Sequence, residues 1–268
     1  MSMTLITFDD YIKNPTGSRS RLVGERDIAQ QVYNDKYNKM LLRCAGNINY
    51  LLFKEKAPGK DNTRFIIYIQ MPSESVEKLY YDVAIDFTAD DDVKRRINKL
   101  DGYYVRFFSN DPNFIYTYAY AFNKAGIIIP ELIPKISQKA IKEAPTHTNP
   151  NELAGYVKSI YFAYLFMRNK GLFNKLMWMN AASVPEMRTF FNRYIMNSDK
   201  KIMYSQHYIQ LMKAKARGDN VKVPKDVKSL EAASKAATNK IQMIRKVQKV
   251  DREVQNHFVK KIKPIGRR

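Results

Sequence analysis

The sequence predicts an α+β protein with an antiparallel, β-rich N-terminal half and a helical C-terminal half that ends in a long basic helix. Three observations indicate this fold class. Segments between residues 47 and 126 are rich in β-branched and aromatic residues, as strands are. Segments after residue 146 show helical start signals and helical spacing of apolar residues. The last stretch combines an apolar stripe with an excess of lysine and arginine.

These changes in character divide the chain into four segments: residues 1–46, 47–145, 146–218 and 219–268. In the first segment, "FDDYIKN" predicts a short helix that is capped by Thr7 and stopped by "PTG". A second helix is expected from Glu25 to Ala45, where apolar residues recur at helical spacing. Gly46 suits the C-terminal cap of that helix.

The second segment predicts an antiparallel sheet of about five strands. The strand-like runs are "YLLFKEKAP", "RFIIYIQM", "YYDVAIDFTA", "YYVRFF" and "FIYTYAYAF". Loops rich in proline, asparagine and serine separate them. The insertion "DDDVKRRINKL" predicts one short helix packed on the sheet, with Asp90 or Asp91 as its cap.

The run "FIYTYAYAF" places an aromatic residue at every second position from Phe114 to Phe122. In a strand, these rings would share one face and could stack nucleic-acid bases. Stacking platforms interleave their rings with basic residues, whereas the nearest basic residues here are Arg106 and Lys124. Rings left in water would also form a large apolar patch. We therefore interpret the run as part of a packed core or a subunit interface.

Helical start signals occur twice in the third segment. The sequence "NPNE" at residues 149–152 resembles a capping box, and it predicts that "ELAGYVKSIYFAYLFMRNKG" is a buried helix. The sequence "SVPE" at residues 183–186 repeats this signal before "MRTFFNRYIMN". A further helix is expected from Asp199 to Arg217, with Gly218 closing it.

The positive charge is concentrated in the last quarter of the chain. Of the formal net charge of +20, the residues from Asp199 to Arg268 carry +13, from 19 basic and 6 acidic side chains. This asymmetry predicts a polyanionic partner, which could be DNA, RNA or an acidic protein surface. In the fourth segment, an apolar stripe can meet a protein surface while the basic face neutralises phosphates. The candidate nucleic-acid contacts are Lys246, Lys249, Arg252, Lys260, Lys261, Lys263, Arg267 and Arg268.

Signatures of catalysis are weak in this sequence. It contains no Gly-x-Ser-x-Gly elbow, phosphate-binding loop or dinucleotide fingerprint, and its three histidines share no metal-ligand spacing. Asp82 and Asp86 would lie on one face of a strand, which leaves a metal-dependent nuclease open. We predict a non-enzymatic protein without a cofactor. A single cysteine, short apolar runs and the lack of a signal-peptide pattern favour a reducing compartment and no membrane partner.

Two stretches carry a resemblance to a known class of proteins: "YYVRFFSNDPNFIYTYAYAFNKAGIIIPELIPKIS" and "ELAGYVKSIYFAYLF". With the abundance of Tyr, Asn and Lys, they resemble virion-associated structural proteins of tailed bacteriophages of low-GC hosts. The resemblance implies a component of the head, neck or capsid interior, in an oligomeric assembly with sibling or other virion proteins. DNA is then the expected polyanion, and the virion or host cytoplasm the expected location. A cytoplasmic nucleic-acid-binding accessory protein of phage replication or transcription is the main alternative.

Overall fold

A five-stranded sheet lies at the centre of the computed structural model, which describes residues 6–13, 23–56, 63–74, 76, 79–89 and 99–217. The strands, in the order β4-β3-β2-β1-β5, are β1 (Asn49–Lys56), β2 (Thr63–Pro72), β3 (Tyr80–Thr88), β4 (Tyr104–Ser109) and β5 (Ala182–Ser183). Neighbours from β1 to β4 pair antiparallel, as predicted. The short β5 runs parallel to β1, so the sheet is mixed. The α+β class is confirmed.

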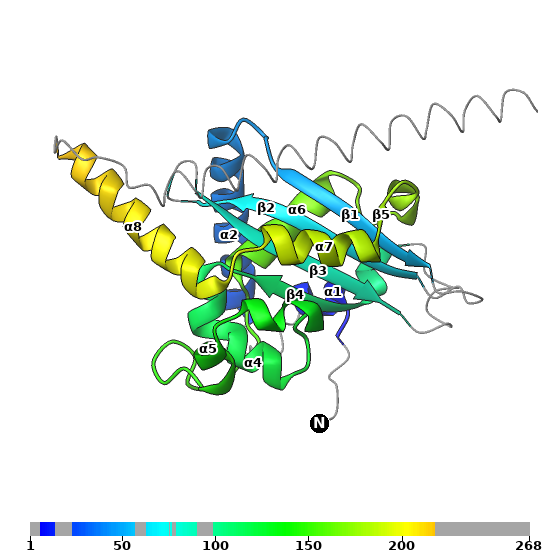
Figure 1. Ribbon diagram of the computed structural model, residues 1–268, viewed down its shortest axis with the longest axis horizontal. Helices are drawn as coiled ribbons and strands as arrows, with labels where there is room; N and C mark the ends of the chain where they lie inside the picture. Colours follow the sequence, from blue (N-terminus) through cyan, green and yellow to red (C-terminus); the bar gives the residue numbers. More distant parts are fainter. Residues whose placement is uncertain are drawn as a thin grey trace, which may run out of the picture.

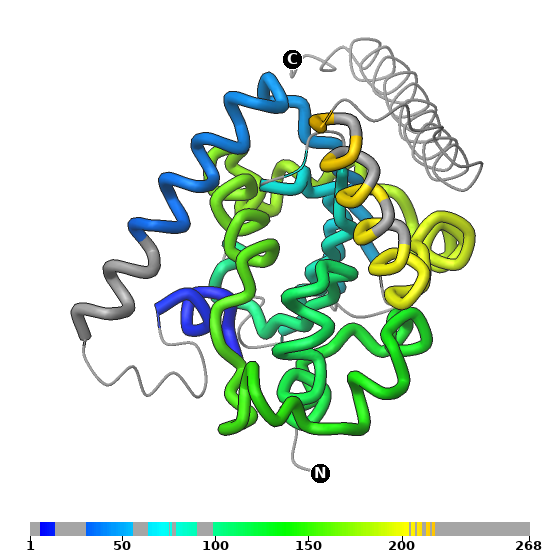
Figure 2. Tube along the Cα trace, turned by 90° about the vertical axis from the view of Figure 1, so that its left-hand side faces the viewer, coloured from blue at the N-terminus to red at the C-terminus, as the bar shows by residue number. Residues whose placement is uncertain are grey.

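Helices cover both faces of the sheet. The helical elements are α1 (Phe8–Lys13), α2 (Val23–Arg43), η1 (Leu100–Gly102), η2 (Phe114–Tyr118), α4 (Ala119–Lys124), η3 (Pro130–Lys135), α5 (Gln138–Lys142), α6 (Lys158–Asn169), η4 (Lys175–Trp178), α7 (Val184–Tyr194) and α8 (Ser198–Ala216). In Figure 1, α7 crosses in front of the sheet and α6 lies behind it. Figure 2, turned by a right angle, places α2 on the outer side of α6.

Several predicted helix ends are confirmed by their caps. The Thr7 hydroxyl accepts a hydrogen bond from the Asp10 N–H at 3.1 Å and so caps α1. Gly46 follows α2 with a φ of +69°, the left-handed conformation that a helix C-terminus often requires. At the start of α7, Ser183 and Glu186 form a reciprocal capping box, as the sequence "SVPE" predicts.

The prediction of a strand at residues 114–122 is wrong, because this run is helical. It forms the π-helical turn η2 followed by α4. Residues two apart share a face in a strand but lie on opposite sides of a helix, whereas residues four apart lie on nearly the same side in both. The helix therefore divides the alternating rings between two sides. Phe114 and Phe122 are fully buried, which confirms the packing interpretation for them, whereas Tyr116 is 54% exposed.

A strand at residues 114–122 is also excluded by the occupation of the β4 edge. The Val105 N–H donates to the Ile6 carbonyl at 2.9 Å, and the Phe107 N–H donates to the Ile127 carbonyl at 2.8 Å. Two other segments therefore satisfy the outer hydrogen bonds of β4 that a fifth strand would need.

The helix predicted from residue 152 begins only at Lys158. The Asn149 side chain accepts a hydrogen bond from the Leu153 N–H at 3.0 Å, but it caps a turn rather than a helix. Glu152 has a φ of +53°, which breaks any helix at that point. The chain then stays extended, so that the Gly155 carbonyl can accept a hydrogen bond from the buried Tyr11 hydroxyl at 3.0 Å.

Two predicted features fall outside the described residues. The short helix expected in "DDDVKRRINKL" lies mainly at residues 90–98, and the basic terminal helix lies at residues 219–268. The described segments share one hydrophobic core, whose buried residues run from Ile6 to Ile202. Phe8 of α1 illustrates its density, because its ring contacts five other aromatic rings.

Candidate functional site

The residues that the sequence predicts to contact nucleic acid lie outside the described residues. All eight, from Lys246 to Arg268, belong to the segment 219–268. The prediction for these side chains rests on the sequence.

The carboxylate of Asp86, a candidate metal ligand in the sequence, is bound by an arginine. It is fully buried on β3, and the Arg64 guanidinium of β2 donates to it at 2.6–3.0 Å. The same guanidinium donates to Glu131 of η3 at 2.6 and 3.0 Å. Although burial opposes it, pairing with the two carboxylates raises the pKa of Arg64, while Arg64 lowers the pKa of Glu131. Asp86 therefore serves the fold by tying η3 to the sheet.

Asp82 lies on the same face of β3 and has different partners. The Tyr68 hydroxyl and the Asn110 side-chain amide each donate to its carboxylate at 2.6 Å. Burial, followed by the charge of Asp82, raises the pKa of the Tyr68 hydroxyl. Lys201 is buried nearby with its ammonium 5.8 Å from the centre of the Tyr81 ring, and burial lowers the pKa of this lysine. Among the described residues, no group of three or more His, Cys, Asp or Glu is placed to hold a metal ion.

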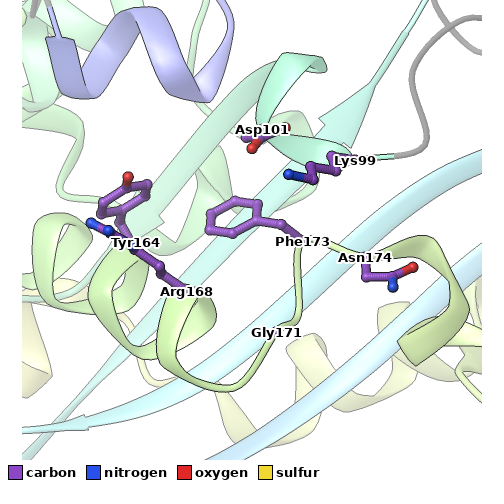
Figure 3. A pocket seen from close by; sticks show the side chains of 7 residues that line it. All are labelled: Lys99, Asp101, Tyr164, Arg168, Gly171, Phe173 and Asn174. Carbon is purple, nitrogen blue, oxygen red and sulfur yellow. The ribbon is translucent and has the colours of Figure 1, made fainter.

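A pocket of about 420 Å³ opens at the C-terminal end of α6, within the size range of small-ligand sites. Its lining combines aromatic rings, two cations, a carboxylate and an amide: Lys99, Asp101, Tyr164, Arg168, Gly171, Phe173 and Asn174. Figure 3 shows the Phe173 ring in the middle, with Tyr164 and Arg168 to one side and Lys99 to the other. The pocket thus presents both positive charge and aromatic surface.

Backbone contacts hold the walls of this pocket together. The chain turns sharply after α6 at Gly171, whose φ of +66° favours glycine. The Leu100 N–H donates to the Phe173 carbonyl at 2.8 Å, and Lys99 pairs with Asn174 in an isolated β-bridge. The sequence gives no sign of this pocket, because its walls come from distant parts of the chain. Only the spacing of Tyr164 and Arg168, four residues apart on α6, is visible in the sequence.

Next to the pocket, η4 and the residue after it expose three large apolar side chains. Leu176, Met177 and Met179 are 69%, 49% and 70% exposed, and we call them the exposed apolar loop. Trp178, which lies between them in the sequence, is fully buried and donates from its indole nitrogen to the Leu172 carbonyl at 2.7 Å. The loop is therefore anchored from inside while its apolar side chains face outward.

Comparison with protein-family models, curated proteins and solved structures finds no match to this chain. Within the described residues, no helix combines the length and the apolar character needed to cross a bilayer. The function is therefore argued from the geometry and charge of the chain itself.

Proposed function

We propose that this chain is a non-enzymatic structural component of a tailed-phage particle, at the head, neck or capsid interior. It contacts sibling subunits or other virion proteins through the exposed apolar loop. It contacts packaged DNA through its basic C-terminal arm, residues 219–268. The observation that carries the proposal is the exposure of Leu176, Met177 and Met179 on an anchored loop.

The exposed apolar loop has the properties of a protein contact. Large apolar side chains that cluster in water are uncommon unless they form an interface. Methionine is common at binding surfaces because its unbranched side chain adapts to the shape of a partner. Complete burial of a leucine or methionine side chain contributes about 1.5–3 kcal/mol. Three such side chains supply a contact of useful strength, repeated in every subunit of an assembly.

The distribution of charge supports the DNA contact. The residues from Asp199 to Arg268 carry a net charge of +13 out of +20. Each phosphate that a lysine or arginine neutralises releases a condensed counterion, which favours binding at low salt. Within the described residues, the last buried residue of the core is Ile202, which precedes the basic arm in the sequence.

Self-association tests the subunit contact. We expect the full chain to associate with rising concentration in sedimentation velocity, and the variant Leu176→Ser/Met179→Ser to shift toward the monomer. Leu42→Ser is the matched control, because Leu42 is 83% exposed but lies on α2, away from the loop. A double variant that associates as strongly as the unchanged chain contradicts the role of the loop.

Binding to duplex DNA over a salt series tests the arm. We expect the affinity of the full chain to fall steeply with salt, because the slope counts neutralised phosphates. A version that ends at Gly218 keeps every core residue of the described part of the chain and should show a much flatter slope. If neither version binds at low salt, the DNA contact is wrong. DNA binding by a chain that never associates favours instead the cytoplasmic accessory protein.

The nuclease is not proposed. Of the two carboxylates that suggested it, Asp86 is engaged by Arg64, and Asp82 by Tyr68 and Asn110. These hydrogen bonds within the fold account for both buried carboxylates.

A further inference from the structure

The pocket at the end of α6 presents charges that the rest of the fold does not use. Within the described part of the chain, neither Lys99 nor Arg168 forms a salt bridge, and both are exposed at the pocket. Some cations of the folded body are paired, as Arg64 is with Asp86 and Lys158 with Glu74. Lys99 and Arg168 line the pocket from opposite sides of the Phe173 ring (Figure 3), and two cations at one concave site favour an anionic ligand.

We propose that this pocket binds a nucleoside phosphate, with the phosphate between Lys99 and Arg168 and the base against the ring of Tyr164. Arginine and lysine are the side chains that most often bind phosphate, and arginine can do so with two parallel hydrogen bonds. Tyr164 is half-buried and offers ring surface for stacking, while the more deeply buried Phe173 forms the floor. The ring centres of Tyr164 and Phe173 lie 5.6 Å apart, so the two rings form one continuous aromatic surface.

The remaining polar groups favour a nucleoside over a bare anion. Asp101 also lines the pocket; its carboxylate repels any anion, but it can accept hydrogen bonds from the donors of a sugar or base. One of its oxygens accepts from the Gly102 N–H at 3.0 Å, and the other can accept from a sugar hydroxyl or a base amino group. Asn174 accepts from the Leu176 N–H through its side-chain oxygen, so its amide nitrogen can donate to a base.

The site is preformed, which lowers the cost of binding. The Gly171 turn, the β-bridge between Lys99 and Asn174, and the Leu100 to Phe173 hydrogen bond already hold its walls. Phe8 packs edge-on against the Tyr164 ring, with the two ring centres 5.5 Å apart. A ligand therefore has to order only the long side chains of Lys99 and Arg168.

Calorimetric titration of the full chain tests the proposal. The four common nucleoside monophosphates are used one at a time, with inorganic phosphate as the comparison. We expect saturable binding of at least one nucleotide, and a loss of about tenfold in affinity for Lys99→Ala and for Arg168→Ala, since each removes a charge-assisted hydrogen bond. Lys170→Ala is the matched control: it removes one exposed positive charge close to Arg168 in the chain but outside the pocket lining, and should change affinity less than about twofold.

Three outcomes overturn the proposal. The first is the absence of saturable binding by any of the four nucleotides. The second is an equal loss in Lys170→Ala and Arg168→Ala, which indicates general attraction to the positive surface. The third is inorganic phosphate that binds as tightly as the best nucleotide, because the base and sugar then contribute nothing. Thermal melting of each variant shows that it is folded, as expected for exposed side chains.

The natural ligand could be a free nucleotide or one unit of a nucleic-acid strand. Binding of a short single-stranded oligonucleotide of the best-binding base distinguishes the two. If Arg168→Ala weakens the oligonucleotide and the mononucleotide by the same factor, the pocket takes one unit of a strand. If only mononucleotide binding responds, the pocket takes free nucleotides. Self-association through the exposed apolar loop depends on neither Lys99 nor Arg168, so this proposal and the subunit contact can fail separately.

Discussion

The two faces of the central sheet come from the same strands but are stabilised by different interactions. The face toward α1 and α6, which we call the aromatic face, is mainly apolar along β2, β3 and β4; its buried apolar residues include Phe65, Ile67, Ile69, Val83, Ile85, Phe87, Val105 and Phe107. At the end of β4, the buried Ser109 hydroxyl lies 3.1 Å from that of Ser159 on α6, and neither group titrates. The face toward α7 and η3, which we call the polar face, carries buried hydrogen-bonding groups among its apolar ones; they are Arg64, Tyr68, Gln70, Asp82, Asp86 and Asn110.

The difference shows how one set of strands combines stability with a specific arrangement. Burial of apolar area has no direction, so the aromatic face tolerates changes that preserve volume. Buried charged groups need defined partners, because a carboxylate without them bears the full cost of leaving water. The network of Arg64, Asp86 and Glu131 therefore allows one position of η3 against the sheet. The two faces should respond differently to substitution and to pH.

Truncation on the aromatic face should have the largest effect. We expect Phe87→Ala to lower the free energy of unfolding by about 3–5 kcal/mol, through lost burial and the cavity left behind. The ring contacts Phe8, Phe173 and Trp178, which cannot all close the gap. Urea denaturation measures the effect, with Phe87→Leu as the milder control. A loss that varies strongly with pH contradicts the absence of titrating groups around Phe87 on this face.

On the polar face, Asp86→Ala should lower the free energy of unfolding by about 3 kcal/mol. This is the lower end of the range for a broken buried ion pair, because Arg64 still pairs with Glu131. The physical reason is that the largely buried Arg64 guanidinium loses one of its two carboxylate partners. The triple variant Arg64→Met/Asp86→Leu/Glu131→Gln removes all three charges of the network and should be less destabilised than Asp86→Ala. A triple variant that is the less stable of the two indicates that the ion pairs themselves, rather than the unpaired charge, dominate.

Glu131→Gln should reveal the pH dependence of the polar face. Arg64 lowers the pKa of Glu131 in the folded state below its ordinary value of 4.5. The contribution of the Glu131 carboxylate to the free energy of unfolding is therefore fully present above its unfolded-state pKa. It is lost as the pH falls through its folded-state pKa. We expect the stability difference between the unchanged chain and Glu131→Gln to be constant near neutral pH and to shrink in acid. A difference that grows in acid reverses the sign and refutes this account.

The helix that covers the polar face depends on its cap. Ser183→Ala removes the side-chain oxygen that accepts from the Glu186 N–H at the start of α7. We expect a loss of about 1 kcal/mol in the free energy of unfolding, as for other N-caps. Thr189→Ala is a suitable control, because that hydroxyl bonds to the Pro185 carbonyl within the helix and caps nothing. Equal losses in the two variants argue against a capping role.

The smallest effect should come from Tyr116, in the run that the sequence predicts as a strand. Tyr116→Ala should change the free energy of unfolding by less than about 0.5 kcal/mol, because its ring faces solvent. Phe122→Ala should cost about 3–5 kcal/mol, since Phe122 is fully buried against Phe107 and Tyr11. Comparable losses at the two positions are what a strand with all its rings on one face would produce, and they contradict the helix.

The elements that the sequence predicts well are those whose determinants are local. The strands β1 to β4 follow from their β-branched and aromatic content, and the start of α7 follows from Ser183 and Glu186. The prediction fails at residues 114–122, where alternating rings form a helix with rings on two sides, and at Asn149, whose cap closes a turn. The pocket could not be predicted, since Lys99 and Arg168 line the same pocket only when the β-bridge and the turn bring their segments together.

By itself, the sequence determined the α+β class, the order of the main elements and the concentration of positive charge toward its C-terminal end. These properties depend on composition and on the spacing of neighbouring residues. Only the tertiary structure decided that Asp86 pairs with Arg64, that Ile6 and Ile127 occupy the edge of β4, and that residues 114–122 are helical. Each of these depends on which distant segments meet, and a buried polar group or strand edge takes the partner that the whole fold brings to it.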